Sequence, residues 1–471
     1  MGQRRDQVSR TSEASRRLSA LWHVRSNARL IRQVGPWAAV GVVAAAIGVA
    51  LAISPLIGLA VAGATLAFGV FVVDPVLFAV IVLPGALLIQ RVGGSSTNLS
   101  AADVLCFGGG LVSLFLVRWS EATHLKHFLR GIVWFQAVLV LVVIAHPFRG
   151  DIVEWFHRWS YLALATIVGW VVATSGRARQ TFRLYLWGST FLGFLAIATA
   201  LTHHLQPAQW GLYQKNAIGA AMWVAIVIAQ INPPWARIDL WESRVIRVVC
   251  LFGLLAAQSR QSAILLALAV GTALLLDPDS RRKAKLAVVV AIPLVGLVYY
   301  SFVTAAHNNP KFNSVSIRYG QIDAALHVWH LSPVLGMGMR FYNLPQYISV
   351  TAPPNSIIDN LASTGIVGSV AFFVLVGMTM FALWRLPRVY GTLGFVVLLA
   401  HYVDGLFDTF WIGSLCIPAM VIAGISLGMA DADPDLRWAP EGRPRDLTRV
   451  RTPAINRRRV DQQRAPLRAN R

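Results

Sequence analysis

Two short polar segments that interrupt apolar sequence carry side chains suited to binding an anion. In the stretch Gly211–Gly219, Lys215 and Asn216 stand at the mouth of a predicted helix, where backbone N–H groups also attract negative charge. In Gln258–Ser262, the whole connection between two apolar segments, Arg260 carries a planar guanidinium that fits a phosphate. Simpler structural roles are an interfacial lysine with Asn216 as a helix cap, and an arginine that caps the preceding helix.

A long stretch between residues 305 and 364 contributes two further candidate cations, Arg318 and Arg340. Ser316–His330 has apolar residues close to helical spacing, which predicts an interfacial amphipathic helix with Arg318 near its start. The glycine-rich turn Pro333–Phe341 follows, and it contains Arg340. Both arginines therefore lie in segments with other distinguishing features.

A third group of polar residues lies within an apolar segment near the end of the chain. His401, Asp404 and Asp408 are spaced i, i+3, i+7, which predicts one shared helical face. An ionisable side chain inside a membrane segment is a functional candidate, and a histidine or carboxylate there can accept a proton from a reacting hydroxyl. The alternative is a His–Asp pair that satisfies itself and ties two helices together.

The elements that must position these side chains are membrane-spanning helices. Of the 471 residues, 56% are hydrophobic and only 13% charged, whereas a soluble domain carries about 25% charged residues. Apolar runs of about 18–20 residues can cross a bilayer as helices. Fourteen apolar segments, several of them short, lie near 37–54, 56–73, 75–90, 101–117, 128–146, 160–175, 183–201, 217–232, 245–257, 261–276, 285–304, 365–384, 390–407 and 412–429. The sequence predicts an all-α polytopic membrane protein of about 12–14 transmembrane helices and excludes a cytosolic enzyme.

The net charge of +21 is distributed as expected for a membrane protein rather than for one that binds nucleic acid. With the N-terminus inside, 34 of the 42 lysines and arginines fall on cytoplasmic segments. Both termini are then predicted to be cytoplasmic, and residues about 305–364 form one long structured extracytoplasmic loop. Among the remaining cations, Arg158 has Asp151 and Glu154 nearby, which predicts ordinary solvated charge.

Three regions are expected along the chain. Residues 1–33 form a basic cytoplasmic N-terminal segment, residues 34–430 the transmembrane domain, and residues 431–471 a basic disordered cytoplasmic tail rich in Arg, Pro and Asp. The three cysteines lie inside apolar segments, and the predicted loop has no carboxylate cluster. The sequence therefore predicts neither a disulfide framework nor a metal or cofactor site.

A family motif can be traced through the end of the predicted loop. Asn355 is followed by nine residues and then by Gly365 and Gly368, and the Lys-Asn, Ser-Arg and Pro-x-x-Gly-x-Gly segments precede it in order. This order resembles the O-antigen ligase and O-antigen polymerase superfamily of bacterial membrane glycosyltransferases. In that family the motif is His, then Asn, Ser or Gln, nine residues and Gly-x-x-Gly. The position of the histidine is taken here by Pro354.

The resemblance implies a metal-independent transferase that moves a glycan from a polyprenyl-diphosphate carrier to an acceptor hydroxyl at the outer face of the bacterial cytoplasmic membrane, in cell-envelope polysaccharide synthesis. The expected partners are that donor, a glycan, glycolipid or glycoprotein acceptor, and membrane lipid, without nucleic acid. Because Pro354 cannot accept a proton, His401 and Asp404 are the predicted catalytic residues. The predicted substrate-binding residues, whose cations would hold the diphosphate, are Lys215, Asn216, Arg260, Arg318, Arg340 and Asn355.

Two other functions stay open. Pro354 also fits a non-catalytic binder or a transporter of lipid-linked sugar that has lost its base. Against a transporter, the sequence contains no repeats and no paired broken helices of the kind that many transporters have. A cell-wall polymerase of the shape–elongation–division type would share chemistry and topology, but no motif matches it.

Overall fold

The computed structural model describes residues 69, 72–89, 91–92, 99–210, 213–277, 314–344, 347, 353–408 and 413–433. The basic N-terminal segment, the apolar segments at 37–54 and 285–304, and the tail beyond residue 433 lie outside the described residues. The chain divides into two compact units, Met1–Pro75 and Val76–Arg471, and everything below concerns the second.

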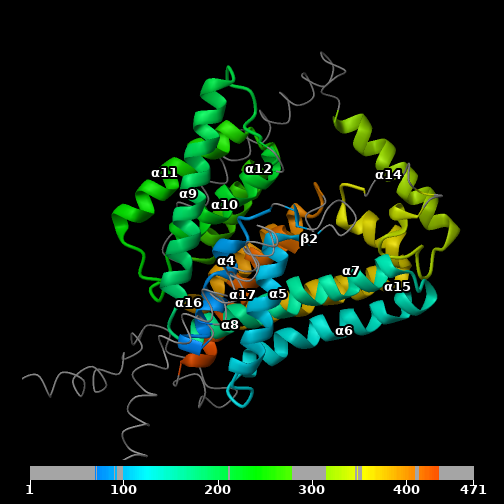
Figure 1. Cartoon of the computed structure of the whole chain (residues 1–471), viewed down its shortest axis with the longest axis horizontal. Coiled ribbons are helices and arrows are strands. Elements are labelled where there is room, and N and C mark those ends of the chain that lie inside the picture. The colour runs from blue at the N-terminus through cyan, green and yellow to red at the C-terminus, as the bar shows by residue number, and fades with distance from the viewer. Residues whose placement is uncertain are drawn as a thin grey trace, which may run out of the picture. The chain divides into compact units, whose positions relative to one another are not determined.

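Helices dominate the described part of the chain and confirm an all-α polytopic membrane protein (Figure 1). Four helices are long and apolar enough to cross a membrane, and three further apolar helices are shorter. A two-residue antiparallel ladder joins β1 (Arg91–Val92) to β2 (Leu99–Ser100). The helices of the first half are α3 (Val76–Val80), α4 (Val82–Gly85), α5 (Ala101–Leu116), α6 (Thr123–Ala145), α7 (Arg149–Trp159), the π-helical turn η1 (Ser160–Leu164), α8 (Ala165–Thr174) and α9 (Ala178–Thr202).

Most of the apolar segments in the described residues become helices close to their predicted bounds. The segment at 75–90 is different, because it forms two short helices, α3 and α4, instead of one span. Pro84 lacks the backbone N–H that a continuous helix would need at this point. The helices of the second half are α10 (Lys215–Ile231), α11 (Leu240–Ala257), α12 (Arg260–Leu276), α14 (Ser314–Leu331), the 3-10 turn η4 (Phe341–Asn343), α15 (Ser356–Trp384), α16 (Arg388–Asp404) and α17 (Gly413–Ala432).

Helix α17 is the most buried of the candidate spans, and it packs against α8 and α16. Gly169 of α8 and Gly424 of α17 meet at the first of these contacts. A Cβ atom on Gly169 would lie 2.9 Å from Cα of Gly424, and one on Gly424 would lie 3.1 Å from Cα of Gly169. Small residues let membrane helices approach closely where lipid provides no hydrophobic driving force. This crossing holds α17 in the core.

Helix α15 is interrupted at Gly365, and the glycine-rich turn fills the interruption. Gly365 has φ 64° and ψ −165°, outside the helical region. Met337 N donates to the carbonyl of Ala362, and Ile366 N donates to the carbonyl of Pro333, both at 2.9 Å. The Pro-x-x-Gly-x-Gly and Gly-x-x-Gly motifs therefore pack against each other and are joined by backbone hydrogen bonds.

Replacing Gly365 with alanine is expected to destabilise the protein by about 2 kcal/mol or more. The new Cβ would lie 2.6 Å from the amide nitrogen of Gly336, and the φ of +64° is strained for any other residue. Gly377, later in α15, has open space around its Cβ position and supplies the control. The thermal unfolding midpoint of purified protein should fall for Gly365→Ala and change little for Gly377→Ala. Equal unfolding midpoints for Gly365→Ala and Gly377→Ala would contradict the close backbone approach at Gly365.

The helix predicted at 316–330 is confirmed as α14, which packs beside α15 (Figure 1). A small apolar cluster joins α14, the glycine-rich turn and α15, and we call it the loop core. It is separate from the main helix core. Its buried members are Ala325, Val328, Phe341 and Ala362.

Candidate functional site

The end of α16 forms a hub at which several of the predicted site segments meet. The carbonyls at a helix C-terminus have no partner within the helix, and here four consecutive ones each accept a hydrogen bond from another element. We call residues Asp404–Asp408 the α16 hub. The four bonds run from Gln261 Nε2 to Asp404 O (3.3 Å), from Ser356 N to Gly405 O (2.7 Å), from Asn355 Nδ2 to Leu406 O (3.0 Å) and from Arg318 Nη1 to Phe407 O (2.6 Å).

The starts of α10 and α12 reach the same hub through Asn216. Its side-chain nitrogen donates to Asp408 Oδ2 at 2.6 Å, and Ser259 Oγ donates to its oxygen at 3.2 Å. Arg318 Nη2 lies 3.8 Å from the same Asp408 oxygen. Asn216 is therefore not a helix cap, the simpler role considered above, but a link between α10, α12 and the hub.

The tight turn that carries Arg260 is confirmed. Gln258 takes a left-handed conformation (φ 52°) that ends α11, and Ser259 caps α12 by accepting a hydrogen bond from Ser262 N at 3.4 Å. Arg260 is then the first residue of α12 and is exposed. The two-residue connection fixes its backbone beside the start of α10.

Three cations gather at the hub, and we call Lys215, Arg260 and Arg318 the cation cluster. Lys215 lies within electrostatic reach of both arginines and of Asp408. Lys215 and Arg260 are exposed, and 37% of the Arg318 side chain is accessible. The positive ends of the α10 and α12 dipoles point to the same place, because these helices begin at Lys215 and Arg260. The cluster therefore favours an anion.

Asn355 is placed by its own helix. Its side-chain oxygen caps α15 by accepting hydrogen bonds from Ile357 N at 2.9 Å and Ile358 N at 3.2 Å, while its nitrogen binds the hub. Pro354 beside it is buried. The asparagine of the motif thus joins the start of α15 to the end of α16.

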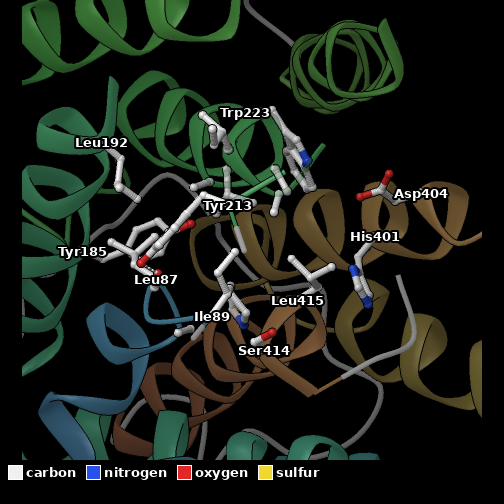
Figure 2. A pocket seen from close by; sticks show the side chains of 18 residues that line it. Leu87, Ile89, Tyr185, Leu192, Tyr213, Trp223, His401, Asp404, Ser414 and Leu415 are labelled. Carbon is white, nitrogen blue, oxygen red and sulfur yellow. Dashed lines mark hydrogen bonds between the residues drawn. The ribbon is translucent and has the colours of Figure 1, made fainter. Parts of the chain in front are cut away.

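His401 and Asp404 line a narrow pocket with mostly apolar walls (Figure 2). They are 2% and 1% exposed, and the other walls come from α9, α10, α17 and the residues after α4. The Asp404 carboxylate accepts a hydrogen bond from Gln261 Nε2, the neighbour of Arg260. The shared face predicted for Asp408 is wrong. Helix α16 ends at Asp404, so Asp408 lies beyond it and faces Asn216 and Arg318 instead.

Arg340 is not held with the cation cluster. Its Nε donates to Glu154 Oε2 at 2.9 Å, and its Nη2 contacts the same oxygen. Its backbone nitrogen donates to Asp151 Oδ1 at 2.9 Å, and only 11% of its side chain is accessible. The predicted phosphate ligand is thus occupied by a carboxylate of α7. Because the glycine-rich turn folds back onto α15 and α7, sequence spacing alone could not show this.

The prediction that Arg158, Asp151 and Glu154 carry ordinary solvated charges is also wrong. Asp151, Glu154 and Arg158 are 0%, 6% and 6% exposed. Arg158 Nε lies 3.4 Å from Glu154 Oε1, and His157 bridges Glu154 (3.6 Å) to Asp103 of α5 (3.0 Å). The i, i+3, i+4 spacing of Glu154, His157 and Arg158 was the available signal. We call Asp103, Glu154, His157, Arg158 and Arg340 the ionic network.

The ionic network changes the protonation of its members in α7, which precedes the apolar segment at 160–175. Burial opposes the charged form of His157, but hydrogen bonds to Asp103 and Glu154 outweigh it and raise the histidine pKa to about 9. Burial also opposes the charge on Glu154, and Arg340, His157 and Arg158 together hold the pKa of that carboxyl well below its usual range. His157 is therefore protonated and Glu154 ionised at neutral pH.

This raised pKa predicts a stability that depends on pH. Since the pKa of His157 is higher in the folded than in the unfolded protein, its contribution is complete below about pH 6.5 and is lost as pH rises towards 9. The loss should reach about 3 kcal/mol at most. Thermal unfolding midpoints of wild type and His157→Gln should therefore converge between pH 6.5 and 9. A constant difference over this range would contradict the charged histidine.

Within the described residues, no three histidine, cysteine or acidic side chains are arranged to hold a metal ion. A family model described as O-Antigen ligase matches residues 245–373. The matched range includes Arg260, Arg318 and Asn355, and it also includes the Pro-x-x-Gly-x-Gly and Gly-x-x-Gly motifs. It ends before α16. Among curated proteins, none matches the chain. The family match confirms, over residues 245–373, the resemblance to the O-antigen ligase and O-antigen polymerase superfamily that the motifs carry.

Proposed function

We propose that this protein transfers a glycan from a polyprenyl-diphosphate carrier to an acceptor hydroxyl. The observation that carries the proposal is the cation cluster at the α16 hub. Lys215, Arg260 and Arg318 come from three segments far apart in the sequence and converge where two helices begin. Asp408 and the Asp404 carboxylate in the adjoining pocket supply two negative charges against three positive ones, so a diphosphate would find a net positive site.

The proposed step needs stabilisation of a leaving group. The acceptor oxygen forms a bond to the anomeric carbon, the bond from that carbon to the diphosphate oxygen breaks, and the electron pair stays on the diphosphate. Arg260 and Arg318 would hold the charge that develops there, since cations fixed in position before the reaction stabilise such charge. Asn216 and Asn355 would keep the segments that carry these cations at the hub.

Asp404 is the proposed proton acceptor, with His401 one turn earlier on the same pocket wall. Asp404 is joined through Gln261 to the turn that carries Arg260, so an acceptor hydroxyl in the pocket would approach a donor held at the cation cluster. The carboxylate would take the proton that the hydroxyl loses. This assignment replaces the family histidine, for which Pro354 leaves no proton acceptor.

The site is proposed to face the outside of the bacterial cytoplasmic membrane, with both termini in the cytoplasm. The support is the distribution of lysine and arginine, which places residues 305–364 on the side with few cations. The product would belong to the cell-envelope polysaccharides.

The test is a transfer assay with full-length protein in nanodiscs, a polyprenyl-diphosphate oligosaccharide donor and a panel of envelope glycans, glycolipids and glycoproteins as acceptors. Transfer of labelled glycan with release of polyprenyl diphosphate is the expected result. Donor binding without transfer across the whole panel would instead favour a non-catalytic binder or a transporter, the function that Pro354 also fits. Absence of donor binding would overturn both.

A further inference from the structure

The ionic network attaches the glycine-rich turn to α7. Arg340 and Glu154 are 11% and 7% exposed in their side chains, and two guanidinium nitrogens of Arg340 contact one oxygen of Glu154. Breaking a buried ion pair by removing one partner is costly, because it leaves an uncompensated charge. Asp151 adds a bond to the backbone of Arg340 itself. The turn is thus held by both main chain and side chain.

Glu154 is itself held from the opposite side. His157 lies 3.6 Å from Glu154 and 3.0 Å from Asp103, at the start of α5. The carboxylate of Asp103 is fixed in turn by the backbone nitrogen of Ser100 at 2.8 Å and by its hydroxyl at 2.7 Å. A continuous chain of contacts therefore runs from the start of α5 through α7 to Arg340.

Helix α14 leads directly into the turn. This helix ends at Leu331, two residues before the turn begins, and carries Arg318 near its other end. The distance along the helix from Arg318 to Leu331 is about 20 Å, so a tilt of about 10° at the turn would move Arg318 by about 3 Å. That displacement would break the 2.6 Å hydrogen bond from Arg318 to the carbonyl of Phe407.

We propose that Arg340 and Glu154 are positioning residues, whose ion pair fixes the angle of α14 and so places Arg318 at the cation cluster. The inference rests on the proposed function, because it assigns Arg318 to diphosphate binding. Arg340 then acts through Arg318 and does not touch the substrate. Errors of about 1 Å in the placement of a reacting group can cost about 100-fold in rate, so such positioning has large effects.

A double-mutant cycle separates this role from direct binding. The dissociation constant of farnesyl diphosphate is measured for wild type, Arg340→Gln, Arg318→Ala and the double variant, each full length in nanodiscs. If Arg340 acts through Arg318, Arg340→Gln weakens binding about 10-fold in the wild-type background and has little effect once Arg318 is absent. Effects that multiply in the double variant would overturn the proposal, because Arg340 would then act independently.

Two further variants serve as controls for a general loss of folding. Glu154→Gln removes the same ion pair from the other side and should weaken binding as much as Arg340→Gln. Arg149→Gln removes an exposed arginine from the same helix α7 and should leave binding unchanged. A loss with Arg340→Gln and none with Glu154→Gln would also overturn the proposal.

Hydrogen exchange provides a readout that does not depend on the proposed function. Arg340→Gln should speed amide exchange in α14 and in the glycine-rich turn but not in α9–α11. If wild type fails to bind farnesyl diphosphate, the proposed function fails, and exchange then decides whether the ion pair fixes α14. Unchanged exchange in α14 would refute the positioning role even in a protein that transfers glycan.

Discussion

Replacing Arg260 with alanine is expected to lower glycan transfer about 100- to 1000-fold, the usual cost of removing one fixed group that stabilises transition-state charge. Arg260 stands at the start of α12, where a two-residue turn and the Ser259 cap leave its backbone little freedom. Because the developing charge on the diphosphate exceeds that of the bound donor, we expect the larger share of the loss in kcat. Transfer rates and donor KM in nanodiscs provide the measurement.

Arg244→Ala is the matched control for this experiment. Arg244 is an exposed arginine on the adjacent helix α11, and its loss removes the same charge from a position away from the hub. Its transfer rate should stay within about 2-fold of wild type, as is usual for surface substitutions away from a site. Equal losses in Arg244→Ala and Arg260→Ala would mean that net charge, and not the cation cluster, controls the reaction.

Asp404→Asn is expected to lower kcat about 100- to 10,000-fold, the range for losing general acid–base catalysis. The asparagine keeps the size of the side chain and an oxygen that can accept the bond from Gln261, but it cannot take up a proton. Donor affinity should therefore remain close to that of wild type. Single-turnover transfer rates and the dissociation constant of the donor measure the two effects separately.

His401→Gln and Asp323→Asn are the comparison variants for this experiment. His401 shares the pocket wall, so its replacement should also reduce transfer, whereas Asp323 is exposed on α14 and its replacement should not. A variant Asp404→Asn that transfers glycan at the wild-type rate would remove Asp404 as the base. Loss of donor binding in that variant would instead assign the carboxylate a structural role at the α16 hub.

The sequence determined the class of the protein and most of its helices, because apolar runs are a local property. It also predicted the tight Ser259–Arg260 turn and helix α14, and both are confirmed. The order of the motifs was enough to indicate a resemblance to the O-antigen ligase family, and the family model that matches residues 245–373 supports that resemblance. The helix periodicity could not show that α16 ends at Asp404, so the expected common face with Asp408 was wrong.

Only the tertiary structure decided which cations belong together. Lys215, Arg260 and Arg318 meet because the α16 hub binds the segments that carry them. The carbonyls of Asp404 and Phe407 bind Gln261 and Arg318, and the Asp408 side chain binds Asn216. Which backbone carbonyls accept such bonds cannot be read from residue types. Arg340 has the same chemistry in the sequence, yet the folded turn directs it to Glu154. The physical reason is that residue type fixes what a side chain can bind, whereas long-range packing fixes which partner lies within reach.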